Sequence, residues 1–425
     1  MGPYQELPAR GLVNLGNTCY LNSVVQALRF TPVLVEHLQR MEEEVLAAQP
    51  VLYCLRQLMS CLTSEEESAG PTVSPWDFLN ASRPSWFAEG EQQDCSEFLT
   101  AMLAALHEEQ WREESKKKEV LEENILMNEN EEAISAVKET TDTVVQVKEE
   151  DFLSLVREVF GGKMKSSYRC HDCHTVSTSV DWFTDLHIPV PEQVRLLEEG
   201  LVPPLEHLPG ITVTSTKELK EVATPLESLL EVALCDELLE DNNKYHCDVC
   251  NGLRDATRSS KIIQTPNVLI LVLLRFKYDA ASQCRKKLTS LVDYPDTLTF
   301  GGESYSLRNV VVHSGCDSGE GHYYTWARRE EATWLVLSDC QVREESWKNF
   351  LESPEHQKND TPYLLFYAKK VAEEVIIIML FIRTWSLHTC FIDQELLSSK
   401  ESHDRGNMDV ATDLTPLLQS TPADI

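Results

Sequence analysis

Two Cys-x-x-Cys pairs restrict the possible folds of this chain more than any other feature. Cys170 and Cys173 form the first pair, and Cys247 and Cys250 form the second. Four thiolates at this double spacing are typical of a structural Zn²⁺ site built from two knuckles. Both pairs stand beside strand-like sequence, so we expect a β-ladder to bring them together. A redox motif and a chance pattern are the weaker alternatives, because the two pairs occur as a set.

The charge balance excludes several classes of function. The 425 residues include 69 acidic and 38 basic side chains, which gives a formal net charge of −31. This excess argues against binding to nucleic acids and to anionic membrane surfaces, and it favours a partner with a basic face. The 13 cysteines and the lack of a signal-peptide pattern favour a reducing compartment, the cytoplasm or the nucleus.

The order of the periodic segments predicts an α+β fold. An amphipathic helix is expected over residues 17–32 and a second one over residues 94–109. Strand-like segments dominate after residue 165. Residues 268–274 form a continuous apolar run, which is typical of a strand buried on both faces. Helices followed by mostly antiparallel strands indicate the α+β class. Further strands are expected at residues 309–312, 323–328, 333–337 and 363–368.

Three stretches interrupt or follow this pattern. Residues 108–150 contain 14 acidic and 6 basic residues and no Gly or Pro, which predicts a solvated insertion that is at most partly helical. Residues 191–224 predict a second, irregular insertion. The tail over residues 371–425 ends in a polar segment that we expect to be partly disordered. Its apolar part, residues 375–392, contains Arg383 and is more typical of a packed or partner-binding segment than of a membrane span.

Cys19 is the first candidate for a chemical role. It lies where the first predicted helix begins, and the positive end of a helix dipole favours a thiolate, so we expect a lowered pKa. The amide of Asn14, five residues upstream, can donate a hydrogen bond to a developing oxyanion. Without further evidence, however, the simpler interpretation is that Cys19 is a buried structural cysteine.

Two longer motifs change this interpretation. Residues 11–23, GLVNLGNTCYLNS, closely resemble the cysteine box of the ubiquitin-specific proteases, which are papain-like thiol hydrolases. Residues 319–326, GEGHYYTW, resemble the histidine box of the same family. The resemblance covers residues 10–370, after a short lead over residues 1–9. It implies a papain-like fold with a helical thumb, an antiparallel β palm and zinc-ribbon fingers, whose knuckles would lie at residues 165–180 and 244–260.

The resemblance also implies roles for individual residues. Cys19 would be the nucleophile and His322 the general base and acid, while Asn14 would help to hold the oxyanion. In the family, an Asn or Asp four residues after a Trp orients the imidazole, but the residue four positions after Trp334 is Ser338. We favour Ser338 as the direct partner of His322. Neighbouring strand residues face opposite sides, so Asp339 would act one step further away, near the oxyanion site.

A third motif concerns the substrate. Residues 92–99, QQDCSEFL, resemble the family segment whose acidic residues contact arginines in the C-terminal tail of ubiquitin. Gln93, Asp94 and Glu97 are therefore candidate substrate contacts. The spacing of Asp94 and Glu97 also fits a capping box at the start of the second helix, and the two roles are compatible.

Together these motifs predict a cysteine-type deubiquitinase. It would cleave the peptide or isopeptide bond after the C-terminal Gly of ubiquitin, through a thioester at Cys19 and with His322 as base and acid. Ubiquitin and ubiquitinated proteins would be its partners, and a structural Zn²⁺ its one cofactor. The alternative is a weak or inactive ubiquitin-binding scaffold, which the unusual Ser338 favours and the intact Cys19 and His322 oppose.

Overall fold

The computed structural model describes most of the region between residues 9 and 370 and none of the tail. The described ranges are 9–41, 48–64, 70–127, 149–191, 223–279, 283–315, 320–329, 333–352 and 359–370. They all belong to the first of the two units into which the chain divides, residues 1–370 and residues 371–425. The central part of the predicted acidic insertion, nearly all of the second insertion and the apolar tail segment therefore lie outside the described residues.

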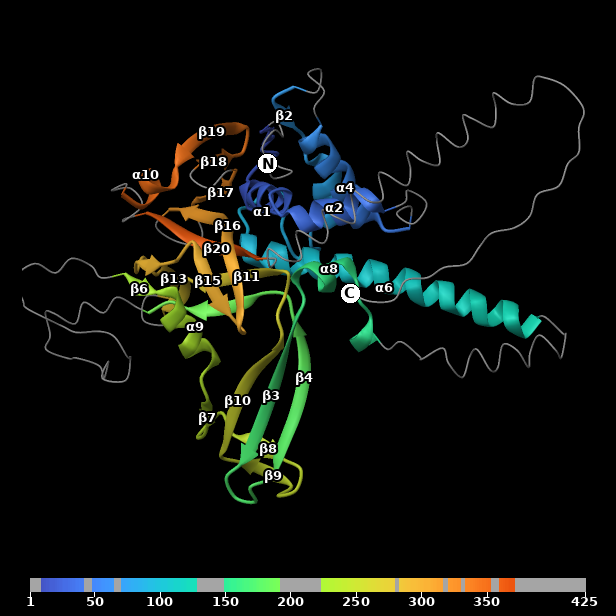
Figure 1. The fold of residues 1–425 in the computed structure, drawn as a ribbon, viewed down its shortest axis with the longest axis vertical. Helices are drawn as coiled ribbons and strands as arrows, with labels where there is room; N and C mark the ends of the chain where they lie inside the picture. Colours follow the sequence, from blue (N-terminus) through green and yellow to red (C-terminus); the bar gives the residue numbers. More distant parts are fainter. Residues whose placement is uncertain are drawn as a thin grey trace, which may run out of the picture. The chain divides into compact units, whose positions relative to one another are not determined.

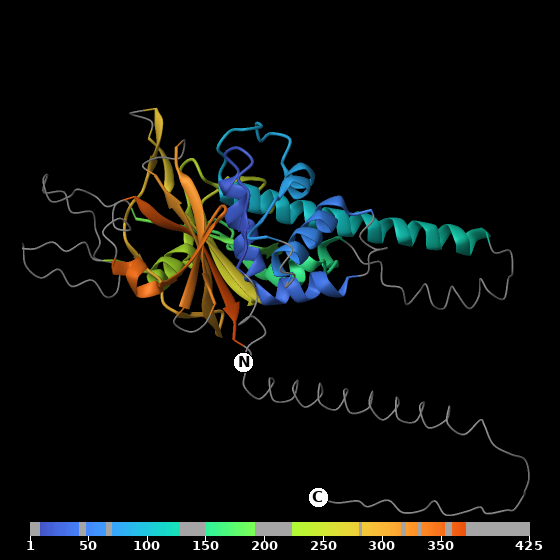
Figure 2. The same ribbon diagram turned by 90° about the horizontal axis from the view of Figure 1, so that it is seen from above.

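Helices form the first half of the described chain and gather on one side of a large sheet (Figures 1 and 2). None of the described helices has both the length and the apolar character needed to cross a bilayer. The helices of this group are α1 (Cys19–Arg29), α2 (Pro32–Arg40), α4 (Pro50–Thr63), α5 (Trp76–Ser82), α6 (Cys95–Met127) and α8 (Leu155–Phe160). The short strands β1 (Gly11–Leu12) and β2 (Thr72–Val73) pair in parallel beside them.

The large sheet has eight strands in the order β19-β18-β17-β16-β20-β11-β5, with β15 paired to β16. All neighbours are antiparallel except β5 and β11. The predicted α+β class is therefore confirmed. The strands are β5 (Leu186–Pro189), β11 (Val268–Leu274), β15 (Thr297–Phe300), β16 (Glu303–Ser314), β17 (His322–Arg328), β18 (Thr333–Ser338), β19 (Gln341–Ser346) and β20 (Asp360–Lys369).

Strand β11 shows why the sheet separates two apolar cores. Its residues 268, 270 and 272 belong to the core beneath the helices, and residues 269, 271 and 273 belong to the core on the opposite face. Side chains alternate across a strand, so a strand covered on both faces needs apolar residues at every position. The second core is covered by α9 (Leu226–Leu234) and includes Phe350 of α10 (Trp347–Glu352).

Helix α1 packs against the sheet through hydrogen bonds as well as apolar contacts. Thr325 Oγ1 on β17 donates to the carbonyl of Ser23 at 2.7 Å, and Asn309 Nδ2 on β16 donates to the carbonyl of Ala27 at 2.9 Å. The helix predicted over residues 17–32 ends at Arg29, and Pro32 belongs to the next helix. This proline occupies the first turn of α2, where a missing N–H costs no hydrogen bond.

Helix α6 is much longer than the predicted helix over residues 94–109. It continues to Met127 and projects from the domain (Figures 1 and 2). The extension is polar, with no Gly or Pro, and it carries ion pairs one turn apart between Glu108 and Arg112 and between Glu113 and Lys116. Local helix propensity therefore continues the helix beyond the point where its buried face ends.

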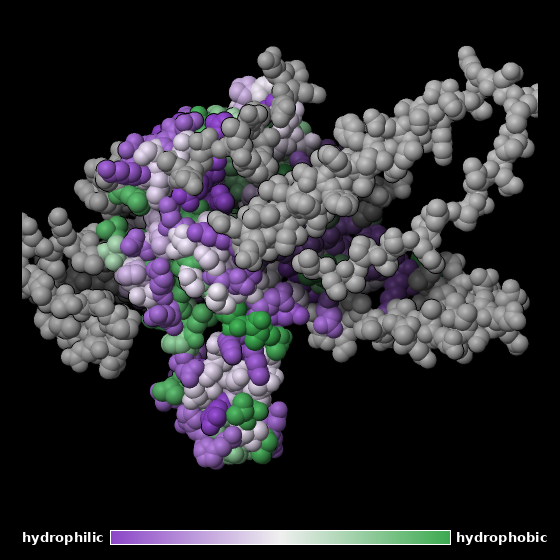
Figure 3. Space-filling model, in the orientation of Figure 1, coloured by the Kyte–Doolittle hydropathy of each residue, from purple (hydrophilic) through white to green (hydrophobic). Residues whose placement is uncertain are grey.

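The four-stranded finger sheet extends away from the large sheet, in the order β4-β3-β10-β7 (Figure 1). Apolar side chains are scattered over its polar surface (Figure 3), and Val176, Val180 and Leu238 are among the exposed ones. A small hairpin of β8 and β9 lies at its tip. The bounds are β3 (Gly162–Cys170), β4 (Val176–Phe183), β7 (Glu237–Leu239), β8 (Tyr245–Cys247), β9 (Gly252–Arg254) and β10 (Ala256–Gln264). Two further small pairs join β12 (Phe276–Asp279) to β13 (Cys284–Lys287) and β6 (Thr224–Pro225) to β14 (Val292–Asp293).

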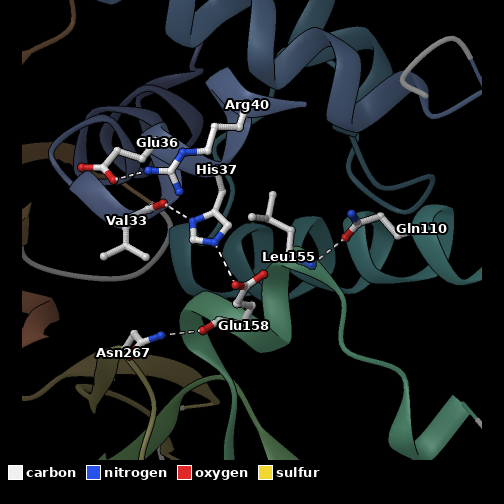
Figure 4. Close-up of polar contacts among 8 residues, drawn as sticks. All are labelled: Val33, Glu36, His37, Arg40, Gln110, Leu155, Glu158 and Asn267. Carbon is white, nitrogen blue, oxygen red and sulfur yellow. Dashed lines mark hydrogen bonds and ion pairs between the residues drawn. The ribbon is translucent and has the colours of Figure 1, made fainter. Parts of the chain in front are cut away.

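A polar cluster joins the helices to the start of β11 (Figure 4). The two ring nitrogens of His37 on α2 lie 2.6 Å from the carbonyl oxygen of Val33 and 2.9 Å from a carboxylate oxygen of Glu158 on α8. Asn267 Nδ2, just before β11, donates to the carbonyl of Glu158 at 2.9 Å. Helix α8 is thus contacted both by α2 and by the segment before β11.

Candidate active site and metal centre

Cys19 lies at the first turn of α1, directly against the start of β17. Its side chain is only 5% exposed, and the backbone N–H of Tyr323 donates a hydrogen bond to its sulfur. Tyr323 follows His322 in the chain, so this bond brings the two motifs from opposite ends of the chain to one place. The residues between them form most of the helices, the fingers and part of the large sheet.

The pKa of Cys19 is raised rather than lowered, so the expectation from its position at a helix start is wrong. Burial is the largest cause, and the negative charge of Asp339 adds to it, while the hydrogen bond from Tyr323 acts in the opposite direction. Desolvation of a thiolate outweighs the helix dipole when the sulfur has little contact with water. The protonated thiol is therefore favoured over the thiolate.

His322 is the first residue of β17, and it is half-buried. Its Nε2 lies 2.8 Å from Ser338 Oγ at the end of β18, the partner that the sequence favoured. Gly321, just before it, passes so close to the ring of His313 that any side chain at this position would overlap that ring. Glycine is thus required for the approach of the chain to His322.

The carboxylate of Asp339 accepts hydrogen bonds from two amides of the cysteine box. Asn14 Nδ2 donates to its Oδ2 at 2.9 Å, and Asn22 Nδ2 donates to its Oδ1 at 2.7 Å. The Oδ1 of Asn14 accepts hydrogen bonds from the backbone N–H groups of Gly16 and Thr18, which fixes the orientation of its amide. Asp339 itself has a left-handed φ of 49° in the two-residue turn between β18 and β19.

Gly11 lies against this turn, and we expect Gly11→Ala to destabilise the protein. A Cβ at position 11 would lie 2.6 Å from the backbone oxygen of Cys340, and the next residue, Leu12, donates its N–H to the carbonyl of Asp339 at 2.8 Å. The free energy of unfolding should fall by about 1–3 kcal/mol in a denaturant titration, as for other overpacked sites. Gly252→Ala is the control, because a Cβ there meets only the flexible side chain of Arg254. Equal effects of the two changes would contradict the assigned contact.

The three residues predicted to contact substrate differ in their burial and in their hydrogen bonds. Asp94 accepts hydrogen bonds from the N–H of Ser96 at 2.8 Å and from Tyr363 Oη at 2.8 Å, so its carboxylate is engaged in capping and packing. Burial raises the pKa of this carboxyl. Glu97 is exposed and accepts a hydrogen bond from Trp86 Nε1 at 2.8 Å. Gln93 is half-buried, and its neighbour Gln92 accepts the N–H of Gly321 at 3.0 Å, which joins this segment to the loop before His322.

The four predicted metal ligands lie together at the tip of the fingers. The sulfur atoms of Cys170, Cys173, Cys247 and Cys250 all lie within 4.8 Å of one another. The Cys170–Cys250 and Cys173–Cys247 sulfur distances are 3.9 and 3.6 Å. Zn–S bonds of about 2.3 Å in a tetrahedron separate the sulfurs by about 3.8 Å, so the cluster fits such an ion. Among the described residues no other group of this kind is present.

Comparison with known proteins identifies the family. The model of the family described as "Ubiquitin carboxyl-terminal hydrolase" matches residues 10–367. The chain belongs to this family. The resemblance inferred from the cysteine and histidine boxes is therefore confirmed, and the family model matches nearly the same residues as the resemblance did.

The curated relatives of this family member are distant in sequence. Human ubiquitin carboxyl-terminal hydrolase 35 is 26% identical over 85% of this chain and 48% of its own length. Human ubiquitin carboxyl-terminal hydrolase 17 is 26% identical over 85% of this chain and 56% of its own length, and the mouse 17-like protein B is 25% identical over 85% and 64%. The chain thus spans about half the length of the first of these relatives.

Solved structures share the fold of this family member. A SAGA DUB module of Ubp8, Sgf11, Sus1 and Sgf73 bound to monoubiquitin matches with a TM-score of 0.59 at 21% identity, over 87% of this chain and 71% of that one. The same module bound to ubiquitin aldehyde matches with a TM-score of 0.57 at 20% identity, over the same shares of the two chains. At this identity the likeness concerns the fold.

Sequence reasoning missed three residues of the candidate site. Asn22 belongs to the cysteine box, but its partner Asp339 lies far away in the chain, so nothing local indicates the contact. Tyr363 was placed on the last strand without its hydrogen bond to Asp94. Trp86 is 65% exposed although its indole N–H is bonded, and a tryptophan among the Pro, Gly and polar residues of this segment was a signal that could have been used.

Proposed function

We propose that this chain is a thiol hydrolase that cleaves the bond after the C-terminal Gly of ubiquitin. The main support is the hydrogen bond from the backbone N–H of Tyr323 to the sulfur of Cys19, because it joins the nucleophile to the residue next to His322. Family membership points to the same reaction class, and the related solved module is bound to ubiquitin in both structures.

The proposed reaction begins with removal of the thiol proton. Ser338 engages Nε2 of His322, so Nδ1 is the ring nitrogen that accepts the proton of Cys19. The sulfur then forms a bond to the carbonyl carbon, and the charge that develops on the oxygen is held by the second amide hydrogen of Asn14 and by backbone N–H groups at the start of α1. Breaking of the C–N bond releases the amine, which takes the proton from His322 and leaves a thioester.

Water completes the cycle. His322 removes a proton from the water molecule that attacks the thioester carbonyl, and the same proton returns to the sulfur when the C–S bond breaks. The products are a free carboxylate on ubiquitin and the Cys19 thiol. The raised pKa of Cys19 suits this mechanism, because the thiol then needs His322 to remove its proton.

Ser338 and Asp339 have different roles in this proposal, and their variants should differ accordingly. Ser338→Ala removes a neutral hydrogen bond to His322, so we expect kcat to fall roughly tenfold. Asp339→Ala releases the amide that faces the oxyanion, and we expect a loss on the order of 10²–10³. Steady-state hydrolysis of a fluorogenic ubiquitin amide measures both. Normal activity of Ser338→Ala together with collapse of Asp339→Ala would remove Ser338 as the residue that orients His322.

Glu97 and Trp86 together offer a site for an arginine of the ubiquitin tail. The carboxylate of Asp94 is already bonded to Tyr363 and to the helix backbone, whereas Glu97 is exposed beside an exposed indole ring. An acid next to an aromatic face suits a guanidinium through an ion pair and a cation–π contact. We therefore assign this contact to Glu97 and a structural role to Asp94.

The cysteine cluster at the finger tip would hold a structural zinc ion. Four thiolates fill a tetrahedral shell, which leaves no position for substrate, so the ion would stabilise the hairpin of β8 and β9 and take no part in hydrolysis. We also propose a reducing compartment such as the cytoplasm or the nucleus, because thiolate ligands require reduced cysteines.

A covalent ubiquitin probe tests the proposed hydrolase against the scaffold alternative. We expect the chain to form an adduct with ubiquitin that carries an electrophile at its C-terminus, and Cys19→Ala to form none. Cys61→Ser is the control, because Cys61 is an exposed thiol that belongs to neither motif. Tight binding of ubiquitin without an adduct would establish a scaffold, and modification of Cys19→Ala would show that another thiol reacts.

A further inference from the structure

Asn22 contacts Asp339 as directly as Asn14 does, but from inside the protein. Each carboxylate oxygen of Asp339 receives one amide, at 2.9 Å from Asn14 and at 2.7 Å from Asn22. Asn14 is exposed at the mouth of the site, whereas Asn22 is only 2% exposed. The carboxylate therefore bridges a buried amide and an amide that can reach substrate.

The surroundings of Asn22 fix which end of its amide faces Asp339. Its Nδ2 lies 2.7 Å from Asp339 Oδ1 and 3.4 Å from the carbonyl oxygen of Val13, and both of these atoms only accept hydrogen bonds. Its Oδ1 is buried and has no hydrogen-bond partner among the described residues. A buried carbonyl without a partner opposes folding, so the amide keeps this orientation for the bond that its nitrogen makes.

The place of Asn22 on α1 connects this bond to the nucleophile. It follows Cys19 by three residues, so the two side chains lie on adjacent positions of one helix face. Asp339 is held in a left-handed backbone conformation, which is rarely adopted without support from neighbouring groups. The Leu12 N–H fixes its carbonyl and the two amides fix its side chain.

From these contacts we infer that Asn22 is a positioning residue of the hydrolytic site. It fixes the carboxylate of Asp339, which in turn aims the amide of Asn14 at the oxyanion. Asn22 touches neither substrate nor the reacting atoms, so its effect passes entirely through Asp339. The inference rests on the proposed function, since it assigns a role in the same reaction.

Asn22→Ser removes the amide and Asn309→Ser serves as its matched control. Asn309 is also a fully buried amide that bonds to α1 and has an Oδ1 without a partner, but it donates to the carbonyl of Ala27 instead of to Asp339. We expect similar losses of stability in thermal unfolding. Below the unfolding temperature of both, kcat on a fluorogenic ubiquitin amide should fall about tenfold or more for Asn22→Ser and less than about twofold for Asn309→Ser, with KM little changed.

Asn22→Asp gives a readout that a purely structural role would not change. It places a second carboxylate against Asp339, and two carboxylates this close share a proton, which raises the pKa of the pair. When the pair holds that proton, an O–H group replaces the amide donor and the bridge forms again. The kcat of Asn22→Asp relative to the parent protein should therefore rise as the pH is lowered below neutral, whereas the ratio for Asn22→Ser should stay flat.

The outcomes separate this inference from the proposed function. If the parent protein hydrolyses the substrate but Asn22→Ser behaves like Asn309→Ser and Asn22→Asp shows no recovery at low pH, the positioning role is wrong and the hydrolase stands. If the parent protein neither hydrolyses the substrate nor reacts with the probe, the proposed function is wrong, and the inference fails with it.

Discussion

His322→Gln should lower the rate of thioester formation by a factor on the order of 10⁴. The expected loss is large because the pKa of Cys19 is raised by burial and by Asp339, so few thiolates form when no base is present. The glutamine keeps a polar side chain at the start of β17 and can still contact Ser338, which preserves the fold around the site. Single-turnover reaction with a fluorogenic ubiquitin amide measures the rate.

The pH dependence of this variant provides a second test. Without His322, the rate should follow the fraction of Cys19 that is ionised, so it should rise about tenfold per pH unit up to the raised pKa of the thiol. The parent protein should reach its plateau at a lower pH, because the histidine removes the proton within the complex. His37→Gln, which alters a histidine of the α2–α8 contact, is the control and should keep normal rates. A residual rate of His322→Gln that does not change with pH would contradict the role of general base.

The sequence predicted those helices and strands whose own residues contain the complete pattern of apolar positions. The apolar run over residues 268–274 coincides with β11, because burial on both faces requires apolar residues without interruption. The start of α1 follows in the same way from its apolar face. Helix α6 was underestimated because its extension has no buried face, and its stability comes from local propensity and ion pairs that do not alter the apolar pattern.

The candidate site also has features that one segment of sequence predicts and features that it does not. Cys19 and His322 stand in motifs that can be recognised locally, and their chemistry follows from their residue types. The raised pKa of Cys19 depends on the burial of its sulfur and on a charge from residue 339, neither of which has a local signature. The bridge from Asn22 through Asp339 to Asn14 likewise exists only after three segments have folded together. The sequence therefore predicts the reactive groups of a site, but it does not predict the contacts that hold these groups in position.

Loss of one finger cysteine should remove the metal and unfold the tip of the fingers. We expect the purified protein to contain about one zinc per chain, and Cys250→Ser to contain almost none, because a structural site needs all four ligands. The exposed Cys235 lies outside the cluster, so Cys235→Ser is the control and should retain the metal. Metal content is measured after denaturation with a zinc-sensitive dye.

We expect the finger tip to depend on the ion, because its other interactions are mostly exposed ion pairs and hydrogen bonds. Strands β8 and β9 have three residues each, and a hairpin of this length is not stable on its own in water. Val249 in its turn and Leu253 in β9 are exposed, so these apolar side chains form no core that could replace the metal. In hydrogen exchange, amide protection in β8 and β9 should therefore fall by several orders of magnitude in Cys250→Ser or after chelation, because metal binding supplies the folding energy of such modules. Strand β11 and helix α1 belong to the apolar cores on the two faces of the large sheet, which do not include the finger tip. Their amide protection should therefore be unchanged. A hairpin that stays protected without zinc would show that the cysteines are packed thiols and not ligands.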